Sequence, residues 1–137
     1  MYRFGVGVTK DPTEAVQWLQ LSANQGLKEA QFELGTMYDE AEGVPESDIE
    51  AVKWYRLAAK QGHGQAQTFL GVMYFMGKGL PQNNLRAYIW WTIAAKYKQD
   101  GAEELLQLAA AELTSEQLDD GKKISSACLS EEYINCE

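Results

Sequence analysis

The feature that most constrains this chain is an internal repeat with a period of 36 residues. Residues 34–38 read LGTMY and residues 70–74 read LGVMY, and each segment leads to a turn that reads GVP or GLP. Periods of this length are typical of arrays in which each unit packs only on its neighbours. Small and aromatic residues recur in register: Ala15, Ala51 and Ala87; Trp18, Trp54 and Trp90; Ala23, Ala59 and Ala95; Gly7, Gly43 and Gly79. The sequence therefore predicts a repeat array with one continuous core.

The first helix of each unit is marked by its ends and by one apolar face. Asp11 is a good N-cap and Pro12 fits the first helical turn, whereas Gly26 can adopt the positive φ that ends a helix. The inward face has the spacing i, i+3, i+4, i+7 and i+8, which is one side of a helix. It comprises Ala15, Trp18, Leu19, Ser22 and Ala23, then Ala51, Trp54, Tyr55, Ala58 and Ala59, then Ala87, Trp90, Trp91, Ala94 and Ala95. All three tryptophans of this column are predicted to lie in the core.

The second helix of each unit carries a glycine in its interior. The first such helix is predicted over about residues 28–40, and it contains Gly35; the next contains Gly71. An interior glycine costs about 1 kcal/mol relative to alanine, so its recurrence needs a reason. Because glycine has no Cβ, we expect a neighbouring helix to approach closely at both positions.

The predicted units cover residues 11–46, 47–82 and 83–113, after the tail of a truncated repeat at 1–10. The third unit departs from the pattern, as terminal units of arrays do. Thr114 and Gln117 form a capping-box signature, T-x-x-Q, that predicts a last helix over 114–129. Leu118, Ile124 and Cys128 are expected to seal the end of the core, and the stretch from residue 130 to 137 is expected to fray.

Residues 54–67 read WYRLAAKQGHGQAQ and residues 70–83 read LGVMYFMGKGLPQN, and these motifs resemble the Sel1-like repeat. The resemblance covers residues 1 to about 106. It implies an all-α fold, a right-handed α-α superhelix of antiparallel helix pairs, and a role as an adaptor for protein complexes, often in bacterial envelope or host-contact settings. Some members carry a disulfide in each repeat, whereas this chain has no cysteine within its repeats.

Composition excludes several classes of function. The net charge of −8 argues against general nucleic-acid binding. No apolar run is long enough to span a membrane, and no signal peptide follows Met1. Cys128 and Cys136 allow one disulfide but no zinc-binding spacing. We therefore predict no cofactor and no metal, and the compartment stays open between the bacterial periplasm or exterior and the cytoplasm.

Two segments carry groups that chemistry could use. His63, the only histidine, occupies a turn position of the resembled family, and no nucleophile can be paired with it. Six acids lie between residues 39 and 50: Asp39, Glu40, Glu42, Glu46, Asp48 and Glu50. They could dock a basic partner or hold Ca²⁺ loosely, but we expect a solvated loop with Asp48 as N-cap, because the spacing is not that of a calcium loop.

The best functional candidate is a surface on the first helices, which by resemblance line the concave side of the superhelix. Its residues are Gln17, Gln20 and Asn24, then Lys53, Arg56 and Lys60, then Ile89, Thr92 and Lys96. We predict a non-enzymatic scaffold that binds a protein or peptide there. The alternative is a cell-wall or β-lactam-related hydrolase, or an envelope- or virulence-associated factor.

A second interaction is predicted at the N-terminal edge. The chain begins inside a repeat, since Met1 and Tyr2 fall in the columns of Met37 and Tyr38. The first helix should then pack on a unit that is mostly missing. We expect an exposed apolar edge near Tyr2, Phe4 and Leu19, and self-association through it.

Overall fold

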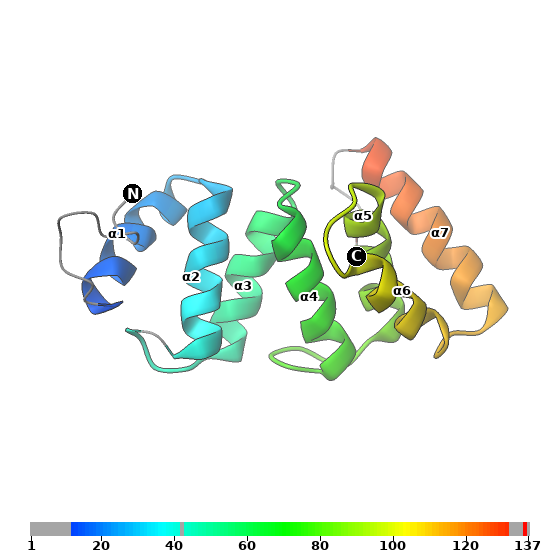
Figure 1. Ribbon diagram of the computed structural model, residues 1–137, viewed down its shortest axis with the longest axis horizontal. Helices are drawn as coiled ribbons and strands as arrows, with labels where there is room; N and C mark the ends of the chain where they lie inside the picture. Colours follow the sequence, from blue (N-terminus) through cyan, green and yellow to red (C-terminus); the bar gives the residue numbers. More distant parts are fainter. Residues whose placement is uncertain (1–11, 42, 132–135, 137) are drawn as a thin grey trace.

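The computed structural model describes residues 12–41, 43–131 and 136, and this part of the chain is all-α (Figure 1). Asp11, the predicted N-cap of the first helix, lies outside the described residues. The helices are α1 (Pro12–Asn24), α2 (Lys28–Glu40), α3 (Asp48–Ala59), α4 (Gly64–Met76), α5 (Asn84–Lys96), α6 (Ala102–Ala110) and α7 (Ser115–Ser130). The predicted all-α fold is confirmed.

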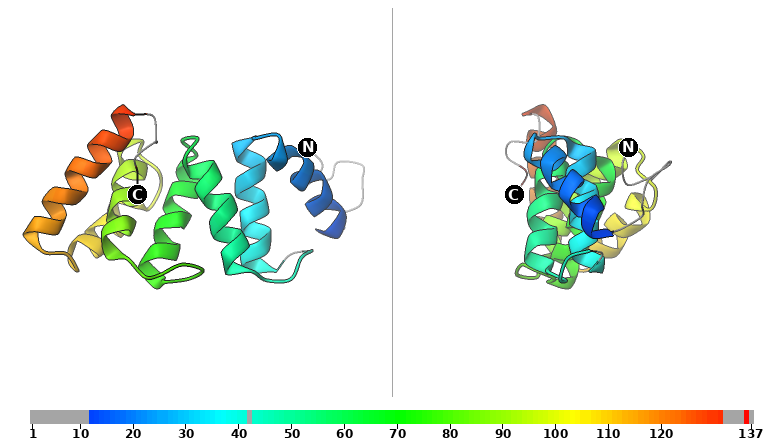
Figure 2. Two further views of the ribbon diagram at one scale, coloured as in Figure 1. Left: turned by 180° about the vertical axis from the view of Figure 1, so that it is seen from behind. Right: turned by 90° about the vertical axis from the view of Figure 1, so that its left-hand side faces the viewer.

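The helices stand side by side in chain order, with α1 at one end of the row and α7 at the other (Figure 1). Seen from the end, the later helices lie behind the first ones, so the array grows along one direction (Figure 2). Each helix from α1 to α5 packs against the next in sequence, and α5 packs against both α6 and α7. This is the nearest-neighbour packing of a solenoid.

The close approach expected at the interior glycines is confirmed. A Cβ built on Gly35 would lie 2.7 Å from Cδ1 of Tyr55, and one built on Gly71 would lie 2.6 Å from Cδ1 of Trp91. Tyr55 and Trp91 are themselves 36 residues apart, and both are buried. The repeat therefore encodes one contact twice: an aromatic ring of the following helix lies in close contact with a glycine.

The core contains two of the three column tryptophans. Trp54 and Trp90 are buried, but Trp18 is 49% exposed, so the prediction for Trp18 is wrong. Trp54 packs against Leu34 and Met37 of the helix pair that precedes it. Trp18 lies on the first described helix, and no described helix precedes it. The same column thus has a different environment on the first described helix.

The C-terminal end closes as predicted, with two differences. Both capping-box bonds form: the Gln117 N–H donates to Thr114 Oγ1 at 3.1 Å, and the Thr114 N–H donates to Gln117 Oε1 at 2.9 Å. Leu118, Ile124 and Cys128 pack on the main core, but α7 extends to Ser130. The expected fraying is wrong at Cys136, which is buried and disulfide-bonded to Cys128. Residues 132–135 and 137 lie outside the described part.

The turns of the repeat use left-handed backbone, and two positions, Ala41 and Lys98, lack the glycine that suits it. Gly77 ends α4 with φ +68°, whereas its equivalent Ala41 ends α2 with φ +58°. A left-handed residue with a Cβ costs about 1–2 kcal/mol, whereas glycine adds about 0.4–1 kcal/mol of unfolded-state entropy. Ala41→Gly should therefore raise the free energy of unfolding by about 0.5–1 kcal/mol, measured by urea denaturation.

Ala127→Gly is the matched control for that substitution. Ala127 is also exposed, but it lies inside α7 in right-handed helical conformation. Glycine there should lower stability by up to about 1 kcal/mol. Loss of stability in both variants would show that backbone strain at Ala41 is negligible.

Candidate interaction surface

The residues predicted to bind a partner lie on three helices that are related by the repeat. Gln17, Gln20 and Asn24 are on α1; Lys53 and Arg56 are on α3, and Lys60 is its C-cap; Ile89, Thr92 and Lys96 are on α5. On α1 and α3 they are exposed or half-buried, as are Thr92 and Lys96. The structure thus presents eight of the nine at the surface.

Ile89 is the exception, because it is 1% exposed and belongs to the main core. Its equivalent on α3 is Lys53, which is exposed. The physical reason lies outside the repeat: α7 packs against α5, and no helix packs in the same way on α3 among the described contacts. Ile89 therefore belongs to a helix–helix contact, and its predicted place on a free surface is wrong.

Two apolar side chains complete the face on α3, and sequence reasoning missed them. Ile49 is 71% exposed and Leu57 is 40% exposed. They lie four residues before and four residues after Lys53, so all three share one side of the helix. We call the set Ile49, Lys53, Arg56, Leu57 and Lys60 the α3 stripe. Its signal in the sequence was an apolar residue on each side of Lys53 at helical spacing.

Two basic side chains of the α3 stripe, Arg56 and Lys53, differ in the contacts that hold them in place. The Arg56 guanidinium donates a hydrogen bond from Nη2 to the hydroxyl of Tyr74 at 2.9 Å, which ties it to α4. Lys53 Nζ lies 4.0 Å from a carboxylate oxygen of Glu50, and this pair is solvent-exposed. Exposed pairs contribute little to stability, so Lys53 can exchange Glu50 for another anion at small cost.

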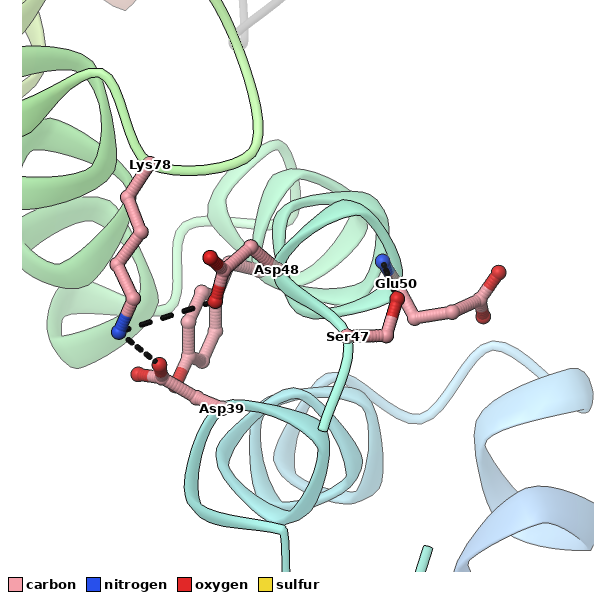
Figure 3. Close-up of polar contacts among 6 residues, drawn as sticks. Asp39, Ser47, Asp48, Glu50 and Lys78 are labelled. Atoms are coloured by element: carbon pink, nitrogen blue, oxygen red, sulfur yellow. Dashed lines mark hydrogen bonds and ion pairs between the residues drawn. The ribbon is translucent and has the colours of Figure 1, made fainter. Parts of the chain in front are cut away.

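The acidic segment at residues 39–50 is partly neutralised from the next unit (Figure 3). Lys78 Nζ lies 2.7 Å from Asp39 Oδ1 and 3.8 Å from Asp48 Oδ1. The hydrogen bond to Asp39 and the charges of Asp39 and Asp48 raise the pKa of Lys78. Lys78, in the turn after α4, therefore links Asp39 of α2 to Asp48 of α3.

Asp48 is not the N-cap that the sequence suggested. Ser47 caps α3, since its Oγ accepts the N–H of Glu50 at 3.2 Å, and Asp48 is the first helical residue (Figure 3). Glu42 lies outside the described residues. Within the described part, no group of three or more His, Cys, Asp or Glu side chains could hold a metal ion. In the same part, every helix is too short or too polar to cross a membrane.

His63 is built into the fold as a helix cap. Its Nδ1 accepts the backbone N–H of Ala66 at 3.1 Å at the start of α4, and its ring stacks on Phe32 at 4.8 Å between centroids. An acceptor nitrogen carries no proton, so the cap requires the neutral ring. Burial lowers the pKa of His63, Lys28 lowers it further, and Glu29 opposes both. The residue thus has a structural task that depends on its protonation.

This task predicts a pH dependence of stability. The folded His63 has a lowered pKa, so the unfolded chain takes up its proton first as the pH falls. The stabilisation is therefore complete above about pH 7.5 and declines as the pH falls through about 6.5. His63→Asn keeps a capping side chain that does not titrate. When the pH falls from about 7.5 to about 6.5, this variant should lose less stability than the parent. Urea midpoints measured at both pH values test this; parallel changes in the two proteins would contradict it.

The edge predicted for self-association is only partly where the sequence placed it. Tyr2 and Phe4 lie outside the described residues. Leu19 is buried against Ala23 and Leu34, so its predicted exposure is wrong. The exposed apolar side chains of α1 are instead Trp18 and Leu21.

Comparison with known proteins agrees with the repeat geometry. The Sel1 repeat model matches residues 1–27, 28–63 and 64–96. The middle match, residues 28–63, contains α2 and α3, whereas the first unit predicted above contains α1 and α2. The predicted unit boundaries 11–46, 47–82 and 83–113 stay a prediction. No curated protein is similar enough to this chain to count as a match.

Two solved structures have the same fold. One is a protective antigen of uropathogenic Escherichia coli strains that displays an SLR fold, with a TM-score of 0.86 and 29% identity over 96% of this chain. The other is a Sel1 repeat protein from Oxalobacter formigenes, with a TM-score of 0.75 and 37% identity over 78% of this chain. The chain spans 29% of the length of the first protein and 44% of the second.

Proposed function

Because this chain belongs to the Sel1 repeat family, we propose that it is a non-catalytic scaffold that binds a protein or peptide partner through its first helices. The observation that carries the proposal is the α3 stripe. Ile49 and Leu57 expose apolar surface beside Lys53 and Lys60, on a chain whose net charge is −8. Apolar side chains among basic ones suit a partner that has an apolar face and acidic groups.

The proposed surface continues on both sides of α3. On α1 it includes Gln17, Gln20 and Asn24, of which Gln20 donates a hydrogen bond to Asn24 at 3.4 Å. On α5 it includes Thr92 and Lys96, without Ile89. Polar groups at the rim set orientation, whereas desolvated apolar groups supply most of the affinity. The α3 stripe is therefore the proposed centre of binding.

The proposal is tested by partner capture with charge-matched variants. The full chain serves as bait beside Lys53→Glu with Lys60→Glu, and beside a control, Lys122→Glu with Lys123→Glu on the exposed side of α7. Arg56 is left unchanged because it is bonded to Tyr74. Lysates of the source cell and of a host cell are both used, since one similar structure is of a protective antigen.

A partner bound by the parent and the control, but lost from the α3 variant, is the expected result. Retention of the partner by all three baits would show that binding occurs elsewhere, and the proposed surface would be wrong. Failure of the parent to capture any protein would count against the scaffold function of this chain.

A further inference from the structure

The repeat brings two equivalent helix faces into different environments. Ile49, Lys53 and Leu57 on α3 correspond, 36 residues later, to Leu85, Ile89 and Ile93 on α5. On α3 all three are exposed: Ile49 at 71%, the Lys53 side chain at 56%, and Leu57 at 40%. On α5, Ile89 and Ile93 are fully buried and Leu85 is partly buried. The same position in the array is thus covered in one unit and open in the other.

The α5 face lies against the helix that ends the array. α7 packs against α5, and Ile89, Ile93 and Cys128 belong to one core cluster. The contact is close, since a Cβ on Gly121 would lie 2.7 Å from Cδ2 of Tyr88 and 3.2 Å from Cδ1 of Leu85. α7 is therefore an example, within this molecule, of a helix seated on the first-helix face of the array.

The contact face of α7 shows what such a helix must offer. Its buried residues are Gly121, Ser125 and Cys128, which have the spacing i, i+4 and i+7 of one helix face. Leu118 and Ile124 flank them and are half-buried against the core. Small residues at the centre let the two helices approach, and apolar residues at the sides cover the face beneath.

We propose that the α3 stripe docks an amphipathic helix of a partner protein, in the way that α7 docks on α5. The inference rests on the proposed scaffold function and specifies the shape and charge of the ligand. The partner helix places small and apolar residues over Ile49 and Leu57. It places acidic residues opposite Lys53 and Lys60, where the α5 face has Ile89 and Lys96. This is helix-in-groove recognition with a charge requirement that α7 itself does not meet.

The spacing of the lysines sets the spacing of the acids. Lys53 and Lys60 are seven residues apart, and Lys60, the C-cap of α3, keeps right-handed helical conformation, so they are about 10.5 Å apart along the helix axis. A partner helix that runs along α3 therefore needs acidic residues about two turns apart. Only a helix with both the apolar face and this acidic spacing matches the whole α3 stripe.

The probe is a labelled peptide built on residues 114–131 of this chain. It carries Cys128→Ala, which removes the thiol, and Lys122→Glu with Lys123→Glu, which make its charged residues acidic. A control peptide adds Leu118→Ser and Ile124→Ser, which remove apolar contacts and leave the charge unchanged. Binding to the full chain is measured by fluorescence anisotropy.

We expect the probe to bind the full chain saturably, and the control peptide to bind at least about tenfold more weakly. Lys53→Glu with Lys60→Glu in the full chain should weaken probe binding at least about tenfold, and Leu57→Ser should weaken it as well. Lys122→Glu with Lys123→Glu in the full chain should leave binding unchanged. Circular dichroism and melting curves confirm that the variants, all at exposed positions, stay folded.

Two results would overturn the inference. One is no saturable binding up to about 1 mM peptide. The other is binding that neither α3 variant changes, which would mean that the peptide occupies another site or displaces α7 from α5. If the capture experiment still depends on Lys53 and Lys60, the scaffold function stands and only the helical ligand is wrong.

Discussion

Gly71→Ala is expected to lower the free energy of unfolding by about 2–3 kcal/mol. The added Cβ would lie 2.6 Å from Cδ1 and 2.8 Å from Cε2 of the Trp91 indole, so the ring must move. Trp91 is 1% exposed, and its Nε1–H donates to the carbonyl of Thr68 at 2.9 Å. Displacement of the ring therefore strains the core and lengthens a buried hydrogen bond. These losses outweigh the gain of about 1 kcal/mol that alanine brings inside an ordinary helix.

A double-mutant cycle with Trp91→Ala assigns the cause. Alanine removes the ring that meets the new methyl group, so Gly71→Ala should cost at least about 1 kcal/mol less in that background. Chemical denaturation of the four proteins gives the coupling energy. Equal costs in both backgrounds, or a gain of stability from Gly71→Ala alone, would mean that the contact with Trp91 does not set the need for glycine.

The fold was predictable because the residues that recur every 36 positions are those that pack helices together. The columns of alanine and aromatic residues gave the faces of α1, α3 and α5, and the recurrent glycines gave the helix ends and the close approach at Gly35 and Gly71. The buried glutamines recur with the same period but were not predicted. Gln31 and Gln67, 36 residues apart, each donate from Nε2 to a carbonyl eight residues earlier, Ala23 and Ala59, at 3.2 Å. Their recurrence was visible in the sequence, but a polar side chain does not reveal its own burial.

The errors fall on helices whose described neighbours differ from those of the equivalent helix. A period predicts the same geometry for Trp18 and Trp54, yet a side chain is buried only if a neighbouring unit covers it. Ile89 is the opposite error: it was predicted to be exposed but is buried, since α7 covers a face that is open on α3. Neither environment can be predicted from the column alone, because each depends on which helix packs beside it.

The candidate site shows the same limit on a smaller scale. The basic residues Lys53 and Lys60 were identified from their spacing, since charged groups on a helix face are seldom buried. Ile49 and Leu57 were missed because an apolar residue is first assigned to a core. Their exposure depends on the absence of a covering helix, which is a property of the assembled array.

Ile89→Lys should have the largest effect of the substitutions considered, a loss of about 3–5 kcal/mol in the free energy of unfolding. It gives α5 the residue that the repeat places on α3. The lysine would lie in the core beneath α7, where it loses the apolar packing of isoleucine and its charge is taken out of water. Urea denaturation measures the loss, and faster proteolysis within α7 should accompany it, since that helix covers the site.

The reverse exchange, Lys53→Ile, is the matched control. The Lys53 side chain is 56% exposed and its contact with Glu50 is a weak surface pair, so stability should change by no more than about 0.5 kcal/mol. Together the two variants move the same side chains between equivalent positions of the array. Similar effects of the two exchanges would mean that α7 does not make the α5 face different from the α3 stripe. A large loss for Ile89→Lys alone would establish that difference, because the helix positions are the same and only the covering helix is not.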